Sequence, residues 1–307
     1  MSGSEKKKRP VSTSAVVRIV IWSVVLCMLS GLYACSMGGA ALGDLKMPHW
    51  VMGPISYRYD EPETYKVGDA TIKETVTSLD IDWVAGHIRI ISDPEATEVT
   101  VRERYASDSD VDEDTRLRWR VKDGKLTVKH CRSGLWMWRS YPEKDLTVTL
   151  PAAMAEALGA VTVDTVEGNV SFVANAESLT LNCVETTAEI TGRIDDLDVD
   201  VVDGGITVRG EIGKATVAAV DARVIMHLDR ANEIHLDCVD GDATLHLSSN
   251  IKGFSATAEG LGRELVTEGF EGATDMERNG KRWGNGSLAI SVEGVDVSLA
   301  IKRMPEE

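Results

Sequence analysis

The sequence predicts an all-β protein whose strands stack as a β-solenoid, a short right-handed β-helix or β-roll-like stack with about 18 residues per coil, preceded by one N-terminal membrane helix. Three features predict it: a repeated unit, alternating polarity inside that unit, and few aromatic residues. The core repeats cover residues 158–249, and the first apolar positions of five successive units recur at a nearly constant step: Val161, Leu179, Leu197, Ala215 and Ile234. A unit this short cannot bury its own apolar face, so the units must stack.

Each unit contains two runs of alternating apolar and polar residues. In the third unit Leu197, Val199 and Val201 alternate with Asp198 and Asp200. This period of two predicts strands with one buried face, and equivalent residues of successive coils should lie about 4.8 Å apart. Aromatic residues make up only 5% of the chain, which suits a narrow interior.

A turn joins the two runs of every unit, and its sequence also repeats. The five turns are Val166-Glu167-Gly168, Val184-Glu185-Thr186, Val202-Asp203-Gly204, Val220-Asp221-Ala222 and Val239-Asp240-Gly241. Glycine at the third position fits a backbone with positive φ. Thr186 and Ala222 depart from glycine, so the turn type cannot be uniform.

The segments before the repeats predict a membrane anchor. Residues 1–18 form a basic tail, residues 19–42 carry no charge and are long enough to span a bilayer, and residues 43–66 form a proline-containing linker. A basic flank stays in the cytoplasm, which places the β-strand-repeat domain, residues 67–303, outside. Two alternatives remain open: a lipoprotein signal at Leu32–Ser36, in which Cys35 would be lipidated, and a cleaved secretory signal.

Both flanks of the repeats predict further strands. Leu79 to Ile90 resembles the repeat unit, and Asp123-Gly124 predicts the turn of a hairpin. After Ser249 the period weakens, and the segment from Phe254 to Ala258 resembles a sixth coil. Atypical terminal coils are expected, because they must protect the ends of the stack from edge pairing.

The charge of the chain limits its partners. Its formal charge is −16 and its pI about 4.9. Nucleic acid requires a basic surface, so we expect no nucleic-acid partner. The same charge argues against a broad contact with anionic lipid.

The run Leu146-Thr-Val-Thr-Leu-Pro151, followed by units of the form Leu-x-Val-x-x-Val-Asp-Gly-x-Ile/Val, resembles a family of bacterial proteins. This is the β-strand-repeat domain of unknown function that is called "putative adhesin", and the resemblance covers about residues 79–301. It implies an extracytoplasmic domain that often follows a membrane anchor, sometimes with a role in envelope stress. The family has no established catalytic residues to carry over.

Four groups of side chains are candidates for binding or catalysis. The turn acids Glu167, Glu185, Asp203, Asp221 and Asp240 could attract Ca²⁺, but the Gly-Gly-x-Gly-x-Asp signature is absent and a solvated turn explains them. His227 and His246 share a column on adjacent coils, without an apparent third zinc ligand. Trp136 and Trp138 could form a platform for sugar rings or a cap over the end of the stack. Cys35 is the candidate lipidation site.

A catalytic role has little support in the sequence. Asp198, Asp200 and Asp237 are outward carboxylates, but no matched basic group or nucleophile motif accompanies them. We therefore expect no enzyme, no cofactor and no metal. The sequence favours a membrane-anchored extracytoplasmic protein with a binding, adhesion or scaffolding role, whose partner is a cell-envelope glycan or protein. The alternatives are an envelope-stress accessory protein and a carbohydrate-active β-helical enzyme.

Overall fold

The computed structural model describes residues 56–57, 59–105, 112–136, 143–262, 264–277 and 279–305. The chain divides into two compact units, Met1–Tyr57 and Arg58–Glu307. The predicted basic tail, membrane segment 19–42 and Cys35 lie outside the described residues. Within the described residues, no helix is long and apolar enough to span a membrane.

The predicted all-β class is confirmed, because strands dominate the second unit. The described helical elements are the one-turn helix α2 (Ala152–Ala155) and two 3₁₀ turns, Pro62–Thr64 and Glu113–Thr115. The strands are β1 (Ser56–Tyr57) in the first unit, and β2 (Lys66–Val67), β3 (Ala70–Ile72), β4 (Ser78–Asp93), β5 (Val99–Tyr105), β6 (Arg118–Lys122), β7 (Lys125–Lys129), β8 (Leu135–Trp136), β9 (Lys144–Pro151), β10 (Leu158–Val173), β11 (Ala176–Leu247), β12 (Gly253–Leu261), β13 (Glu264–Glu268), β14 (Thr274–Met276), β15 (Gly280–Gly284), β16 (Leu288–Val295) and β17 (Val297–Arg303) in the second.

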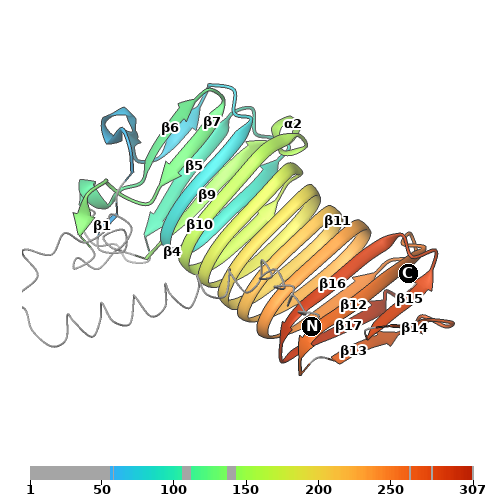
Figure 1. The fold of residues 1–307 in the computed structure, drawn as a ribbon. Helices are drawn as coiled ribbons and strands as arrows, with labels where there is room; N and C mark the ends of the chain where they lie inside the picture. Colours follow the sequence, from blue (N-terminus) through green and yellow to red (C-terminus); the bar gives the residue numbers. More distant parts are fainter. Residues whose placement is uncertain are drawn as a thin grey trace, which may run out of the picture. The chain divides into compact units, whose positions relative to one another are not determined.

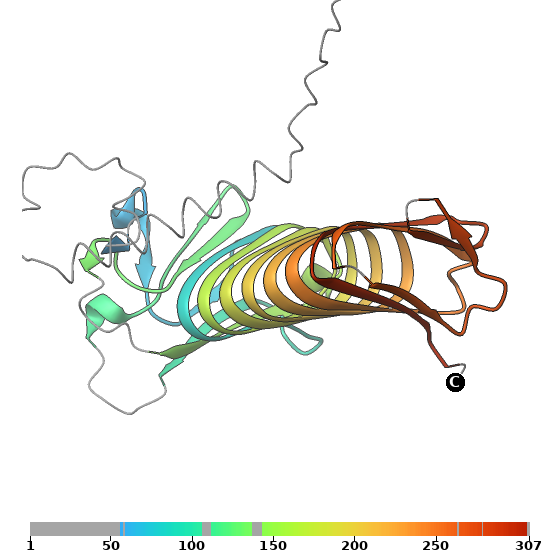
Figure 2. The ribbon, with the colours of Figure 1, turned by 60° about the horizontal axis from the view of Figure 1, so that its bottom comes forward.

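The chain of the second unit winds in successive coils whose strands pair in parallel (Figures 1 and 2). Val161 of β10 pairs with Leu79 of β4 on one side and with Leu179 of β11 on the other. The offset between the paired residues of β10 and β11 is the repeat length read from the sequence. The predicted early coil, from Leu79 to Ile90, is therefore confirmed as part of β4.

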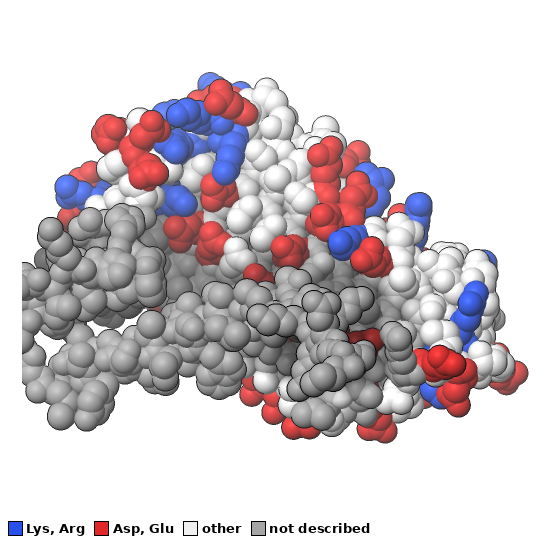
Figure 3. Space-filling model, in the orientation of Figure 1, with Lys and Arg blue, Asp and Glu red and all other residues white. Residues whose placement is uncertain are grey.

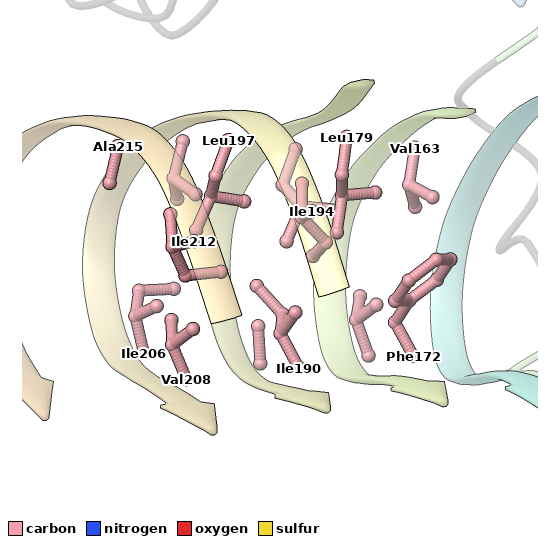
Figure 4. Close-up of a cluster of buried hydrophobic side chains, with 14 of the residues drawn as sticks. Val163, Phe172, Leu179, Ile190, Ile194, Leu197, Ile206, Val208, Ile212 and Ala215 are labelled. Carbon is pink, nitrogen blue, oxygen red and sulfur yellow. The ribbon is translucent and has the colours of Figure 1, made fainter. Parts of the chain in front are cut away.

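The coils enclose an interior of apolar side chains. Val163, Leu179 and Leu197 face Phe172 and Ile190 across the space between the two runs of each coil (Figure 4). All five side chains are completely buried. Burial of a large aliphatic or aromatic side chain contributes about 1.5–3 kcal/mol, so the repeated inward positions supply the main stabilisation.

The turn glycines allow the close approach of successive coils. Gly168 and Gly204 have φ of 133° and 146°. A Cβ atom at Gly204 would meet the carbonyl oxygen of Thr186 in the preceding coil. The side chain of Thr186 itself is buried, at 2% exposure, and its φ is not positive. The turns are therefore not uniform.

The N-terminal end of the stack is closed by strands that follow β4 in the sequence. β7 and β9 both pair in parallel with β4, and β6 and β7 form the predicted hairpin around Asp123 and Gly124. β5 runs antiparallel to β9. Between them, the buried Nζ of Lys144 lies 2.7 Å from Oε2 of the buried Glu103. Burial lowers the pKa of Lys144 to about 8, although Glu103 opposes the shift.

The order of the last coils differs from the predicted order. The segment from Phe254 to Ala258 lies in β12, as a coil strand, but β12 does not follow β11 in space. Ile290 of β16 pairs with Ile234 of β11 on one side and Ala256 of β12 on the other, so β16 lies between β11 and β12. The antiparallel β15 pairs with β12 beyond it. The chain thus returns to pair β16 with β11, and the antiparallel strand protects the outer edge.

Candidate functional site: an exposed valine ridge between two rows of acids

One outward column of the stack consists of valines. Thr165 pairs with Trp83 and with Cys183, and Glu167 pairs with Ala85 and with Glu185, so Val166 lies between Val84 and Val184. The same register continues through β11 to β16. We call this column the valine ridge: Val84, Val166, Val184, Val202, Val220, Val239 and Val295.

The ridge is exposed because the regular alternation places its valines outward. Val161, Val163 and Thr165 are buried on alternate positions, so Val166 faces solvent like Asp164. The alternation breaks one residue later, where Glu167 is also exposed, before the chain turns inward again at Val170. Val166, Val184 and Val202 are 50%, 47% and 42% exposed, and the other ridge valines are partly exposed. An apolar side chain thus occupies a solvent-facing position in seven coils.

A row of acids follows the ridge on one side. These turn acids are Glu167, Glu185, Asp203, Asp221, Asp240 and Asp296, and all are exposed. Carboxylates that kept a coil spacing of about 4.8 Å would repel each other by about 0.9 kcal/mol per neighbouring pair in water, before screening by salt. The row therefore destabilises the free protein slightly.

A second row of acids precedes the ridge on the other side. These strand acids are Asp82, Asp164, Asp200, Asp237 and Glu293, with Asn182 and Ala218 in the same column. Nδ2 of Asn182 donates a hydrogen bond of 2.6 Å to Oδ1 of Asp164. Partial burial and then the neighbouring Asp198 raise the pKa of Asp200. Nζ of Lys129 lies 3.4 Å from Oδ2 of Asp82, so the first strand acid is part of an ion pair. From Asp164 onward the ridge runs between two rows that carry negative charge.

Charge elsewhere on the stack is distributed differently. Lys and Arg side chains gather over β6 and β7, while Asp and Glu occur along the coils (Figure 3). Several of these cations are paired: Arg120 lies 2.8 Å from Glu61, and Lys125 lies 2.7 Å from Asp80. These two ion pairs belong to the strands that close the N-terminal end of the stack.

The structure brings His227 and His246 together as predicted. Their rings are parallel within 4° and their centroids are 4.5 Å apart. The pKa of each is lowered, first by burial and then by neighbouring positive or titratable groups: His246 and Arg209 for His227, and Lys302 for His246. No group of three His, Cys, Asp or Glu residues that could hold a metal occurs among the described residues.

The other predicted site residues are two tryptophans and the outward carboxylates. Trp136 belongs to β8, but its side chain is outside the described part, as is all of Trp138, so the sugar platform stays a prediction. Asp198 and Asp200 face solvent as predicted. Two surface hollows of about 380 and 460 Å³ lie next to Met276 and Arg193 respectively, away from these carboxylates.

The valine ridge was not identified from the sequence, although a signal existed. A valine precedes the turn acid in every core repeat, one position out of phase with the buried residues. An apolar residue that recurs at a turn, next to an acid, cannot be explained by the inward pattern. The phase of the alternation could therefore have indicated an exposed apolar column.

Comparisons with known proteins give distant structural similarity only. No family model matches the chain, and no curated protein matches its sequence. The crystal structure of a putative adhesin from Bacteroides fragilis aligns with 78% of this chain and 97% of its own, with a TM-score of 0.39 and 15% identity. That of a putative adhesin from Parabacteroides merdae covers 79% and 97%, with a TM-score of 0.39 and 11% identity.

A putative cell adhesion protein from Clostridium sporogenes is also similar. Its crystal structure covers 78% of this chain and 100% of its own, with a TM-score of 0.35 and 15% identity. All three matched proteins are bacterial.

Proposed function

We propose that the chain is a membrane-anchored, extracytoplasmic protein with a non-catalytic binding, adhesion or scaffolding role at the cell envelope. Its second unit serves as a right-handed β-solenoid that displays regular columns of side chains. The observation that carries this proposal is the valine ridge, whose valines keep up to half of their surface in contact with solvent. A continuous apolar surface on a solvent-exposed face of a protein is typical of an interaction site.

The ridge suits an extended partner better than a small substrate. Its residues are related by the coil repeat, so they present the same chemistry at intervals of about 4.8 Å. A catalytic site instead needs different groups that converge on one point. The anchor is supported by the uncharged segment 19–42 and its basic flank.

Binding can be tested on arrays. The full-length chain is labelled and applied to a glycan array and to a peptide array, with a heat-denatured sample as control. Binding by the folded chain alone supports the proposal. A chain that binds nothing but cleaves a cell-wall polysaccharide would favour the carbohydrate-active alternative.

The location requires a separate experiment. Alkaline phosphatase fused after Glu307 should be active in cells, because the enzyme folds only outside the cytoplasm. An inactive but well-expressed fusion would reverse the topology. Mass spectrometry of the mature N-terminus distinguishes the anchors, since an acylated Cys35 would exclude the spanning helix.

A further inference from the structure

We propose that the valine ridge binds a cationic amphipathic polypeptide segment, which lies along the axis of the stack with its apolar residues on the valines and its cations on the two rows of acids. This inference rests on the proposed binding function and names the chemistry of the partner. It also names the site, the column that begins at Val84 and ends at Val295.

The charges select a cationic partner. The turn acids line one side of the ridge in six successive coils, and the strand acids line the other side with two interruptions. Like charges at this spacing repel, and a partner with cations on both flanks relieves that repulsion. Partial burial, and then Asp198 two residues earlier on the same strand, disfavour the ionised form of Asp200 and raise its pKa, an effect that a nearby cation would oppose.

The exposed valines select a partner that is also apolar. A cation without apolar groups would leave Val166, Val184 and Val202 in contact with water, at 42–50% exposure. The ridge from Val166 to Val295 spans five coil steps, or about 24 Å. An amphipathic helix of about 16 residues has the same length, and its turns repeat every 5.4 Å, close to the coil spacing.

The long side chains of lysine and arginine complete the fit. Their apolar stems can lie along a hydrophobic surface while the charged ends reach outward. A helix centred on the ridge can therefore extend its cations over both acid rows. A second copy of the chain is disfavoured, because two copies placed ridge to ridge would bring four rows of acids together. Anionic polymers are disfavoured for the same reason.

The probe is a 16-residue peptide of lysine and leucine whose leucines form one helical face. A peptide of the same composition with its leucines spread around the helix tests amphipathicity, and a 16-residue polylysine tests charge alone. Each carries a fluorophore, and binding to the full-length chain in a non-ionic detergent is followed by anisotropy at two salt concentrations. Peptide that binds to the detergent contributes equally to the anisotropy of every variant, because all variants are measured in the same detergent. It therefore does not affect the comparison between variants.

Two variants remove one component of the ridge each. Val184→Ser with Val202→Ser removes apolar surface, and we expect affinity to fall about tenfold, since two half-exposed valines lose their contacts. Glu185→Gln with Asp203→Asn removes two charges, and we expect a loss of about three- to tenfold that shrinks at high salt. All four side chains are exposed, so thermal melts should match those of the unmodified chain.

The matched controls change the same chemistry away from the ridge. Glu211→Gln with Asp229→Asn removes two exposed acids from another outward column, and Val173→Ser removes a valine that is 42% exposed off the ridge. Both should bind the amphipathic peptide within about twofold of the unmodified chain, because neither touches the proposed site.

The outcomes separate the partner from the general function. Loss in the ridge variants alone, with weak binding of polylysine and of the shuffled peptide, supports the proposal. Two results would show only non-specific attraction to a chain of charge −16 and would overturn the proposal. One is an equal loss of affinity in the acid variant of the ridge and in the acid control variant. The other is binding of polylysine as tight as that of the amphipathic peptide. So would self-association that disappears in the valine variant. A chain that ignores all three peptides but binds on the glycan array would overturn this partner and leave the binding function standing.

Discussion

The inward direction of Val201 and the outward direction of Asp200 can be tested by exchanging their chemistry. Val201 is 3% exposed, and its column neighbours are Cys183 and Ala219, which offer no charged partner. In Val201→Asp the new carboxyl group must stay protonated at pH 7 or open the coil. Holding a carboxyl of ordinary pKa near 4 in its neutral form at pH 7 costs about 4 kcal/mol. The lost burial of valine adds to this.

The opposite change one residue earlier should be almost silent. Asp200 faces solvent, and its pKa is raised by partial burial and by Asp198. A carboxyl whose folded-state pKa is raised makes the folded protein lose stability as pH rises through that pKa. At pH 7 the ionised side chain of Asp200 therefore lowers the free energy of unfolding slightly. Asp200→Val removes this destabilising charge and exposes one apolar side chain. We expect a change below about 1 kcal/mol.

Chemical denaturation followed by circular dichroism measures both variants. Val201→Asp should lose at least about 3 kcal/mol of unfolding free energy, a large part of a typical total of about 5–15 kcal/mol. Asp200→Val should keep the midpoint of the unmodified chain. Equal losses, or a larger loss in Asp200→Val, would mean that the strand is out of phase by one residue.

Further predictions concern the cap, the turns and the histidine pair. Lys144→Met leaves the buried Glu103 with the partly exposed Arg116 as its ion-pair partner and should cost up to about 3–5 kcal/mol in a thermal or chemical melt. Recovery in the double variant with Glu103→Leu would show that the loss came from the weakly compensated charge of Glu103, and a loss that persists in the double variant would contradict this. Gly204→Ala places a Cβ against the preceding coil at a φ of 146° and should cost about 1–3 kcal/mol, whereas Gly205→Ala, whose nearest neighbours lie at 3.9 Å, should cost much less; equal midpoints would contradict the close approach. The pKa of His246 is lowered on folding, so as pH drops the unfolded chain binds a proton first, near pH 6.5, and the free energy of unfolding should fall below that pH. His246→Gln should make this fall less steep. An unchanged dependence of stability on pH in the variant would contradict the prediction.

The repeat itself could be predicted from the sequence, because it depends on interactions between residues that are close in the chain or in adjacent coils. The alternation of Leu197, Val199 and Val201 sets which side chains face inward, and the nearly constant step between units sets which ones stack. The hairpin at Asp123 followed from turn chemistry in the same way. These features depend on neighbours in the chain or on the next coil.

The order of the terminal coils was not readable. At both ends the outermost coil is not the terminal one in sequence: β7 and β9 lie outside β4, and β12 lies outside β16. At each end the inner and the outer strands carry the same alternating pattern. The pattern therefore cannot predict which of them pairs with the core repeats. The buried Lys144–Glu103 pair was also not predicted, because its two residues come from strands 41 positions apart. Such contacts follow from topology, which the repeat alone leaves open.

The alignment of the exposed valines along one edge underlies both the proposed function and its partner, and spin labels can measure it. Cysteines at chosen ridge positions carry the labels, while Cys27 and Cys35 are replaced by serine. The three remaining native thiols are buried, and burial raises the pKa of Cys131 to about 12 and that of Cys183 and Cys238 to about 11. They should therefore react slowly with the label.

Two labelled pairs give the decisive distances. Labels at Val184→Cys and Val202→Cys occupy adjacent coils, so their EPR spectrum should be strongly broadened by a backbone separation of about 5 Å. Labels at Val166→Cys and Val239→Cys are four coils apart and should give a dipolar distance centred near about 19 Å. An unbroadened spectrum for the first pair, or a second distance that does not grow with the number of coils, would contradict the aligned ridge.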